Sequence, residues 1–219
     1  MLYLANPCGS DVLTAMQAGA IGYIDTPAQG NIRPEGVVWC MDNGCFSDKF
    51  DEAKWWRYLQ RHASDASSCL FATAPDVVGD AAATLERSTP WLPKIRDLGY
   101  PVAFVAQDGL GIHWNGSLHG GDLDGPTVEW ADFDVLFVGG TTGWKLGPHA
   151  RALVAEAKRR GKWVHMGRVN SERRFEYARA IGCDSADGTY LTFGPDTNLP
   201  KLLAWTRNTA QDALFEETP

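Results

Sequence analysis

The chain has 219 residues, of which 44% are hydrophobic, 11% aromatic and 21% charged, and this composition excludes a disordered or collagen-like protein. Its 27 acidic and 20 basic side chains give a formal net charge of -7. Such a charge argues against a protein that coats nucleic acid through many phosphate contacts, although it leaves room for a local basic groove. The five cysteines contain no CxxC pair, so neither a disulfide framework nor a four-thiolate zinc site is predicted.

The first residues, MLYLANPCGSDVL, lack the basic start and the long apolar stretch of a secretory signal. No later segment approaches the ~18 consecutive apolar residues that a membrane span needs. An odd number of cysteines fits a reducing compartment. We therefore expect a cytoplasmic protein that does not enter a membrane.

Short apolar segments predict strands at residues 2–5, 21–24, 37–41, 70–74, 102–106, 135–138 and 163–166, with a weaker one at 181–183. Helical patterns lie between most of them, at residues 11–18, 51–63, 80–98 with interruptions at Pro90 and Pro93, 148–160, 171–180 and 199–215. Alternating strands and helices are typical of parallel βα units. Eight such units predict one domain over residues 1–219, a compact α/β protein with the (β/α)8 TIM-barrel fold.

Two units depart from this alternation. The second, at residues 21–43, has no helical pattern after its strand. Residues 108–132 are too polar and glycine-rich for a core helix, and we expect them to form a long loop over the barrel mouth. An open doubly wound sheet is disfavoured because no GxGxxG follows the first strand.

Polar residues follow the predicted strands, and in this fold the loops at the carboxyl ends of the strands build the active site. An aspartate there often caps the next helix, which suits Asp80 but suits Asp42 and Asp184 poorly, because no helix starts directly after them. Several carboxylates around one mouth indicate cleavage of a glycosidic bond. The strand-end residues are Asn6, Asp25, Asp42, Asp76, Gln107 with Asp108, Gly139 with Gly140, His165 to Arg168, and Asp184.

Six segments in register carry a resemblance to a known family. The run WCMDNGCFS at residues 39–47 resembles the DSGGF/Y motif of tRNA-guanine transglycosylases. The similarity continues with TAPDVVGD at 73–80, FVAQDG at 104–109, FVGGTTG at 137–143, HMGRVNSERRF at 165–175 and IGCDSADGTYLTF at 181–193. Within that superfamily the chain is most similar to the short, zinc-free DpdA-type enzymes, which insert 7-deazaguanines into phage or bacterial DNA.

The resemblance implies a transglycosylase that exchanges guanine for a preQ0-like 7-deazaguanine base. Asp184 falls where the family has its nucleophile, which attacks the anomeric carbon C1′ and holds the sugar covalently. Asp42 matches the second aspartate, expected to move the proton on the leaving or incoming base. A carboxylate suits the first role because the transition state resembles an oxocarbenium ion.

The resemblance also implies a base pocket. Asp76 and Gln107 match positions that hydrogen-bond the edge of a guanine-like base, and the backbone of Gly139 and Gly140 would meet its carbonyl. Glycine lets the main chain come that close. The family sandwiches the base between two side chains, and the matching residues here are Phe46 and Met166, which read equally well as barrel core without the resemblance.

The expected partners are DNA, in preference to tRNA, and a free 7-deazaguanine base. A duplex base must leave the stack before C1′ can be attacked, and Trp114, Arg168, Arg173 and Arg174 are candidates to hold the displaced nucleotide. No cofactor is predicted. A family-style zinc site is excluded because no cysteine or histidine follows Asp184.

Other interpretations stay open at this stage. A free nucleoside or nucleotide could be hydrolysed by the same carboxylates, and the acidic balance favours this reading. A catalytically silent base-binding protein would need only the stack of Phe46 and Met166, but the pair of aspartates argues against it.

Two other sets of residues are weak candidates for chemistry. Cys45 replaces the second motif glycine, and no histidine is next to it in the sequence to make it a nucleophile. The spacing of His113, His119 and Asp122 matches no specific metal site, so a solvated loop is the better interpretation.

Overall fold

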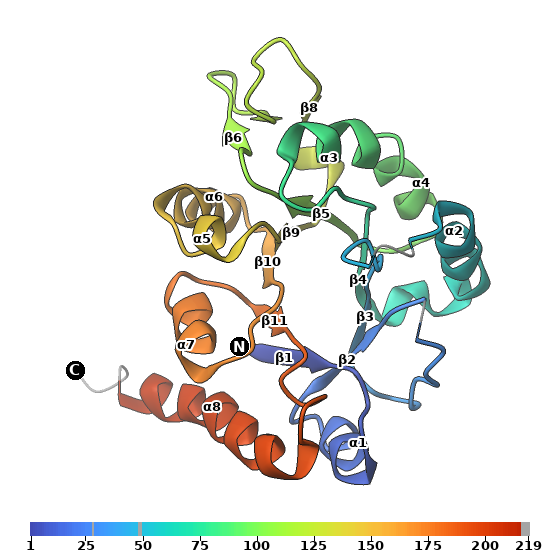
Figure 1. The fold of residues 1–219 in the computed structure, drawn as a ribbon, viewed down its shortest axis with the longest axis vertical. Helices are drawn as coiled ribbons and strands as arrows, with labels where there is room; N and C mark the ends of the chain where they lie inside the picture. Colours follow the sequence, from blue (N-terminus) through green and yellow to red (C-terminus); the bar gives the residue numbers. More distant parts are fainter. Residues whose placement is uncertain (28, 48–49, 216–219) are drawn as a thin grey trace.

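The computed structural model describes residues 1–27, 29–47 and 50–215 and has the (β/α)8 architecture that the sequence predicts. Parallel strands close into a barrel in the order β1-β11-β10-β9-β5-β4-β3-β2, and helices surround this ring (Figure 1). The strands are β1 (Leu2–Ala5), β2 (Gly22–Asp25), β3 (Trp39–Met41), β4 (Cys69–Thr73), β5 (Val102–Ala106), β9 (Val135–Val138), β10 (Trp163–Met166) and β11 (Ser185–Asp187).

Several helices begin directly after a capping side chain. Asp51, Asp80 and Ser171 each accept a hydrogen bond from a backbone N–H in the first turn of the helix that follows. None of the described helices is long and apolar enough to cross a membrane. The helices are α1 (Ser10–Gln17), α2 (Glu52–Arg61), α3 (Ala81–Ser88), α4 (Leu92–Asp97), α5 (Thr142–Lys145), α6 (Pro148–Arg159), α7 (Glu172–Ala180) and α8 (Pro195–Phe215), with 3-10 helices η1 (Ala63–Ser68) and η2 (Trp130–Asp132).

Side chains alternate along each strand between two apolar layers. The larger layer lies between the strands and the helices, and Phe104 and Leu136 are buried there. The smaller layer fills the inside of the barrel and consists of Leu4, Ile24, Cys40, Phe71, Ala103, Val105, Val135 and Phe137. A residue's place in this alternation therefore decides whether it can reach the barrel mouth.

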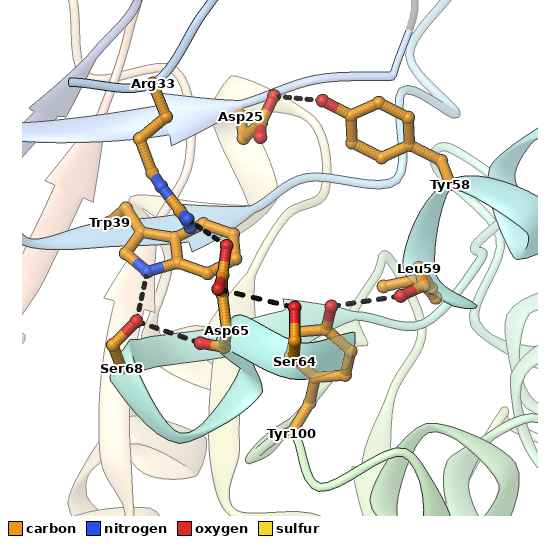
Figure 2. A network of polar contacts seen from close by, with 9 residues as sticks. All are labelled: Asp25, Arg33, Trp39, Tyr58, Leu59, Ser64, Asp65, Ser68 and Tyr100. Carbon is orange, nitrogen blue, oxygen red and sulfur yellow. Dashed lines mark hydrogen bonds and ion pairs between the residues drawn. The ribbon is translucent and has the colours of Figure 1, made fainter. Parts of the chain in front are cut away.

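The segment between β2 and β3 has no helix among its described residues, as the sequence predicts. Arg33 holds it against η1: the guanidinium pairs with Asp65 at 2.5 Å and lies 3.7 Å from the centroid of the Trp39 ring (Figure 2). The Trp39 indole N–H donates to Ser68 at 3.0 Å. These contacts cover the outer face of β3 that a helix would otherwise cover.

Residues 111–128 form a small antiparallel sheet of β6 (Gly111–Ile112), β7 (Leu118–His119) and β8 (Thr127–Val128). It lies beside α3 and α6 and projects outward from the ring of helices (Figure 1). Leu118, Val128 and Trp130 bury their side chains in the outer apolar layer. Residues 108–132 thus cover the flank of the barrel after β5, and they do not form the loop over the mouth that we expect from the sequence.

The eighth strand is displaced from its predicted position. Helix α7 ends at Ala180, and Gly182 follows with a φ of 97°, a left-handed conformation that closes the helix. Residues 181–183 are therefore the turn after α7, and the prediction of a strand there is wrong. Strand β11 begins at Ser185, where it pairs with Leu2 of β1 and His165 of β10.

Candidate active site

A cavity of about 280 Å³ opens at the carboxyl ends of the barrel strands. Apolar side chains such as Val105 and Phe137 line it together with several polar ones, a combination that sites for small organic groups use. The lining side chains that matter below are Asp42, Asn43, Phe46, Thr73, Asp76, Val105, Gln107, Phe137, Arg168 and Asp187, together with the backbone of Gly44, Gly139, Gly167 and Gly188.

Asp42 enters the cavity from the end of β3. Its backbone N–H donates to the carbonyl of Asp25 at 2.8 Å, which continues the pairing of β2 with β3 by one residue. Burial raises the pKa of its carboxyl to about 7, and the negative charges of Asp187 and Asp76 act in the same direction. Asp42 can therefore both give and take a proton near neutral pH.

Asp187 enters the cavity from the end of β11. One carboxylate oxygen lies 2.9 Å from Nε2 of His165, and the other accepts the backbone N–H of Arg168 at 3.0 Å. Asp187 is thus a strand-end carboxylate that lines the same cavity as Asp42. Asp187 is not among the site residues predicted from the sequence, because the last strand was expected at residues 181–183 and lies at Ser185–Asp187.

Asp184, the residue that the sequence predicts as the nucleophile, lies at the opposite end of β11. Its carboxylate pairs with Lys158 in the last turn of α6 at 2.8 Å and accepts the backbone N–H of Val164 at 2.7 Å. It does not line the cavity. The expectation that Asp184 stands at the carboxyl end of a strand is corrected: it precedes the strand and closes the amino-terminal side of the barrel.

Asp76 and Gln107 lie side by side on the cavity wall, as expected. The Gln107 amide donates to Asp76 Oδ2 at 2.5 Å, and the Asn43 amide donates to Asp76 Oδ1 at 2.7 Å. Burial raises the pKa of the Asp76 carboxyl, an effect that these two donors oppose. The carboxylate keeps unused lone pairs, since two oxygens offer about four acceptor positions.

Gly139 and Gly140 come close to this network. Gln107 Oε1 accepts the backbone N–H of Gly140 at 2.8 Å and that of Gly79 at 2.9 Å. A Cβ atom on Gly139 would lie 2.9 Å from Gln107 Nε2 and 2.7 Å from Val105 Cγ1, so only glycine fits there. Gly139 lines the cavity, whereas the N–H and C=O of Gly140 are both used within the protein.

The Thr73 hydroxyl is an unused polar group in the cavity wall. Its Oγ1 is buried and has no hydrogen-bond partner in the structure. Thr73 ends β4 and lines the cavity. Because an unpaired buried hydroxyl is costly, this atom is available to a polar group of a ligand. Nothing in the sequence pattern singles it out.

Phe46 stands at the rim, where 67% of its surface is exposed. The guanidinium of Arg168 lies 4.7 Å from the centroid of its ring, and Arg168 also donates to the carbonyl of Gly140. Arg168 has a φ of 59°, an unusual value for a residue other than glycine. The structure therefore brings together Phe46 and Arg168, one expected base-stacking residue and one expected nucleic-acid contact.

Met166 does not face the cavity. It follows His165 on β10, and because His165 points into the barrel, Met166 points outward into the layer under the helices. It is 1% exposed. The expectation that Met166 stacks on a base is corrected in favour of its reading as barrel core.

The other expected contacts also lie away from the cavity. Trp114 is 90% exposed on the turn between β6 and β7, and Arg173 and Arg174 lie in the first turn of α7.

Two further residues from the sequence do not take a catalytic role. Burial raises the pKa of the Cys45 thiol to about 12, which disfavours a thiolate nucleophile. Asp25 faces outward and accepts a hydrogen bond from the Tyr58 hydroxyl at 2.9 Å (Figure 2).

No protein-family model matches the chain, and no curated protein matches it. Among solved structures it is similar to the c-di-GMP complex of PaMucR phosphodiesterase, with a TM-score of 0.39 and 15% sequence identity. That alignment covers 70% of this chain and 60% of the phosphodiesterase chain, so this chain spans about 60% of its length. A functional assignment therefore has to rest on the residues of the cavity.

Proposed function

We propose that this protein is a pentosyltransferase that exchanges guanine for a 7-deazaguanine base in DNA through a covalent bond between Asp187 and the sugar. The observation that carries the proposal is the pair of carboxylates in one cavity, Asp42 and Asp187, in different environments. Burial raises the pKa of Asp42 to about 7, whereas Asp187 is held by His165 and the N–H of Arg168. Such a difference separates a proton-transfer group from a nucleophile.

The proposed reaction has two displacements. A carboxylate oxygen of Asp187 forms a bond to C1′ as the bond from C1′ to the purine nitrogen breaks, and the electron pair leaves with the base. Asp42 gives its proton to that base, which departs neutral. Asp42 then takes a proton from the 7-deazaguanine, whose nitrogen attacks C1′ and releases the Asp187 carboxylate.

Recognition of a guanine-like base rests on Asp76. The Watson–Crick edge of guanine has two adjacent N–H donors, and a carboxylate can accept both. Asp76 is fixed by Asn43 and Gln107, so it meets the base without first losing side-chain freedom. The free hydroxyl of Thr73 adds a group that can donate to or accept from the same ligand.

A second candidate function is hydrolysis of a free nucleoside or nucleotide. Arg168 is the only lysine or arginine among the described residues that line the cavity, and the net charge of the chain is -7. Both observations favour a substrate with few phosphates. Water would then take the place of the incoming base, with the same roles for Asp42 and Asp187.

The experiment is release of radiolabelled guanine from DNA, from tRNA and from free nucleosides, each with and without 7-deazaguanine. The proposal expects release from DNA that depends on the added base, with incorporation of that base. Release from nucleosides without any added base would establish the second candidate. Binding of the base without release from any substrate would leave a base-binding protein and overturn the proposal.

A further inference from the structure

A chain of hydrogen bonds runs through the inside of the barrel and ends on Asp187. The Trp163 indole N–H donates to Ser185 Oγ at 2.9 Å, and Ser185 Oγ lies 2.8 Å from His165 Nδ1. His165 Nε2 lies 2.9 Å from Asp187 Oδ2. The chain begins at the first residue of β10 and ends at the last residue of β11.

The chemistry of the four groups favours one direction for the donors. An indole nitrogen can only donate, and an ionised carboxylate can only accept. The Ser185 hydroxyl accepts from Trp163, so its own hydrogen is free to go to His165 Nδ1. Nε2 then carries the imidazole proton and donates a hydrogen bond to Asp187. In this neutral tautomer every donor of the chain meets an acceptor.

Packing of the barrel interior does not by itself explain a histidine at position 165. It is fully buried, and its ring packs against Phe137 and Phe71 at centroid distances of 4.5 and 5.1 Å. An apolar side chain would fill this position without needing hydrogen bonds. Ser185 is also fully buried and is the residue that satisfies the inner nitrogen of the ring.

We propose that His165 is a positioning residue for Asp187 and that Ser185, itself held by Trp163, keeps its imidazole in the Nε2–H tautomer. This inference rests on the proposed function, in which Asp187 is the nucleophile. The imidazole and the backbone N–H of Arg168 each occupy one carboxylate oxygen, so the group cannot rotate. Its remaining lone pairs are then presented to the cavity in one orientation.

The same contact assists the second displacement. When the bond between C1′ and Asp187 breaks, the electron pair returns to the carboxylate beside the Nε2–H donor. A donor placed in advance stabilises that charge without rearrangement. Positioning of this kind changes the rate of the chemical steps more than the binding of substrate.

The test compares His165→Leu with His165→Gln, whose amide can still donate toward Asp187. We expect His165→Leu to lower kcat by about 10- to 100-fold with little change in KM, and His165→Gln to recover much of the loss. Phe71→Leu is the matched control, because Phe71 packs on His165 inside the barrel without lining the cavity. Equal kcat losses in His165→Leu and Phe71→Leu would overturn the inference.

A second measurement does not depend on activity. Nitrogen-15 NMR of the histidine rings, with the His165 signals identified by their loss in His165→Gln, reads the tautomer directly. We expect a protonated Nε2 and an unprotonated Nδ1 in the wild type. A ring protonated on Nδ1, or on both nitrogens at neutral pH, would overturn the inference even if the enzyme is active. An inactive wild type with the expected tautomer would instead overturn the proposed function.

Discussion

Asp184 and Asp187 lie at opposite ends of the same short strand, and their carboxylates serve opposite sides of the barrel. Asp184 precedes β11 and pairs with Lys158 at 2.8 Å. Asp187 ends β11 and lines the cavity, where it meets His165. Two aspartates three residues apart therefore differ in surroundings enough for substitutions to separate their roles.

The first prediction compares Asp187→Asn with Asp184→Asn. Asp187→Asn should reduce base exchange by about a thousandfold or more, because a neutral amide is a poor nucleophile at C1′. Asp184→Asn should keep exchange near the wild-type rate and lower the free energy of unfolding by about 1 kcal/mol, since its ion pair is partly exposed. Steady-state exchange rates and urea denaturation measure the two effects.

Trapping of a sugar adduct is an independent test of whether Asp187 or Asp184 is the nucleophile. The wild type and Asp184→Asn should both form a covalent complex with DNA, and fragment-ion mass spectrometry of the peptide that contains both aspartates should place the added sugar on residue 187. Fragment ions that place the sugar on residue 184, or loss of exchange in Asp184→Asn alone, would show that Asp184 is the nucleophile.

The second prediction concerns Asp42 and the pH dependence of stability. The pKa of its carboxyl is raised from 3.8 to about 7, so the folded state binds the proton more tightly than the unfolded state. Stability is then lost as pH rises between these two values. Asp42→Asn carries no charge, so its stability relative to the wild type should increase by about 1 to 3 kcal/mol between about pH 5 and pH 8.5.

Urea denaturation at several pH values tests this trend. Asp97→Asn is the control, because Asp97 is an exposed carboxylate at the end of α4 and does not line the cavity. That variant should follow the wild type at every pH. If Asp42→Asn runs parallel to the wild type as well, Asp42 is ionised throughout and cannot serve as the acid of the reaction.

Much of the barrel could be predicted from the sequence. Strands β5, β9 and β10 have the predicted bounds, because both faces of a barrel strand are buried and most of their residues are apolar. The bounds of strand β11 were not predicted, because its inner face consists of Ser185 and Asp187. These two side chains hydrogen-bond with His165 and do not join the apolar layer. A search for apolar runs cannot find such a strand, although Gly182 marks the end of α7 before it.

The candidate site was predictable in part, for a related reason. Asp42 and Gln107 lie directly after strands whose bounds the sequence predicts closely, and Asp76 lies three residues after the end of another, so the structure brings them to the cavity. Met166 was misplaced because the alternation of β10 puts His165, not Met166, on the inner face. The unpaired hydroxyl of Thr73 depends on the packing of several strands, and no local pattern encodes it.

The third prediction tests the close approach at Gly139. In Gly139→Ala the new methyl group would meet Gln107 Nε2 at 2.9 Å and Val105 Cγ1 at 2.7 Å, so Gln107 must move away from Asp76. We expect binding of 7-deazaguanine to weaken by about 1 to 3 kcal/mol. Gly143→Ala is the matched control, because nothing lies within 4 Å of its added Cβ. Calorimetric titration should show unchanged affinity in the control, and equal affinities in both variants would contradict the placement of Gln107.

The last prediction separates the edge of the base from its face. Asp76→Ala removes the acceptor for the two guanine donors, so 7-deazaguanine should lose about 1 to 3 kcal/mol of binding while 7-deazaadenine loses little. The same variant leaves one N–H of the Asn43 amide and one of the Gln107 amide without an acceptor, so it should also lower the free energy of unfolding. Phe46→Ala removes the exposed ring at the rim and should weaken both bases alike, by about 1 to 3 kcal/mol, with little effect on folding.

Calorimetric titration of the two variants with the two deazapurines measures this difference, because these bases differ at the Watson–Crick edge that Asp76 is proposed to read. Asp76→Asn serves as the control for shape, since it keeps the volume and one acceptor oxygen and should lie between the wild type and Asp76→Ala in selectivity. Selectivity for 7-deazaguanine should collapse in Asp76→Ala and persist in Phe46→Ala. An equal loss of selectivity in both variants would mean that the purine does not stack on Phe46 with its edge toward Asp76.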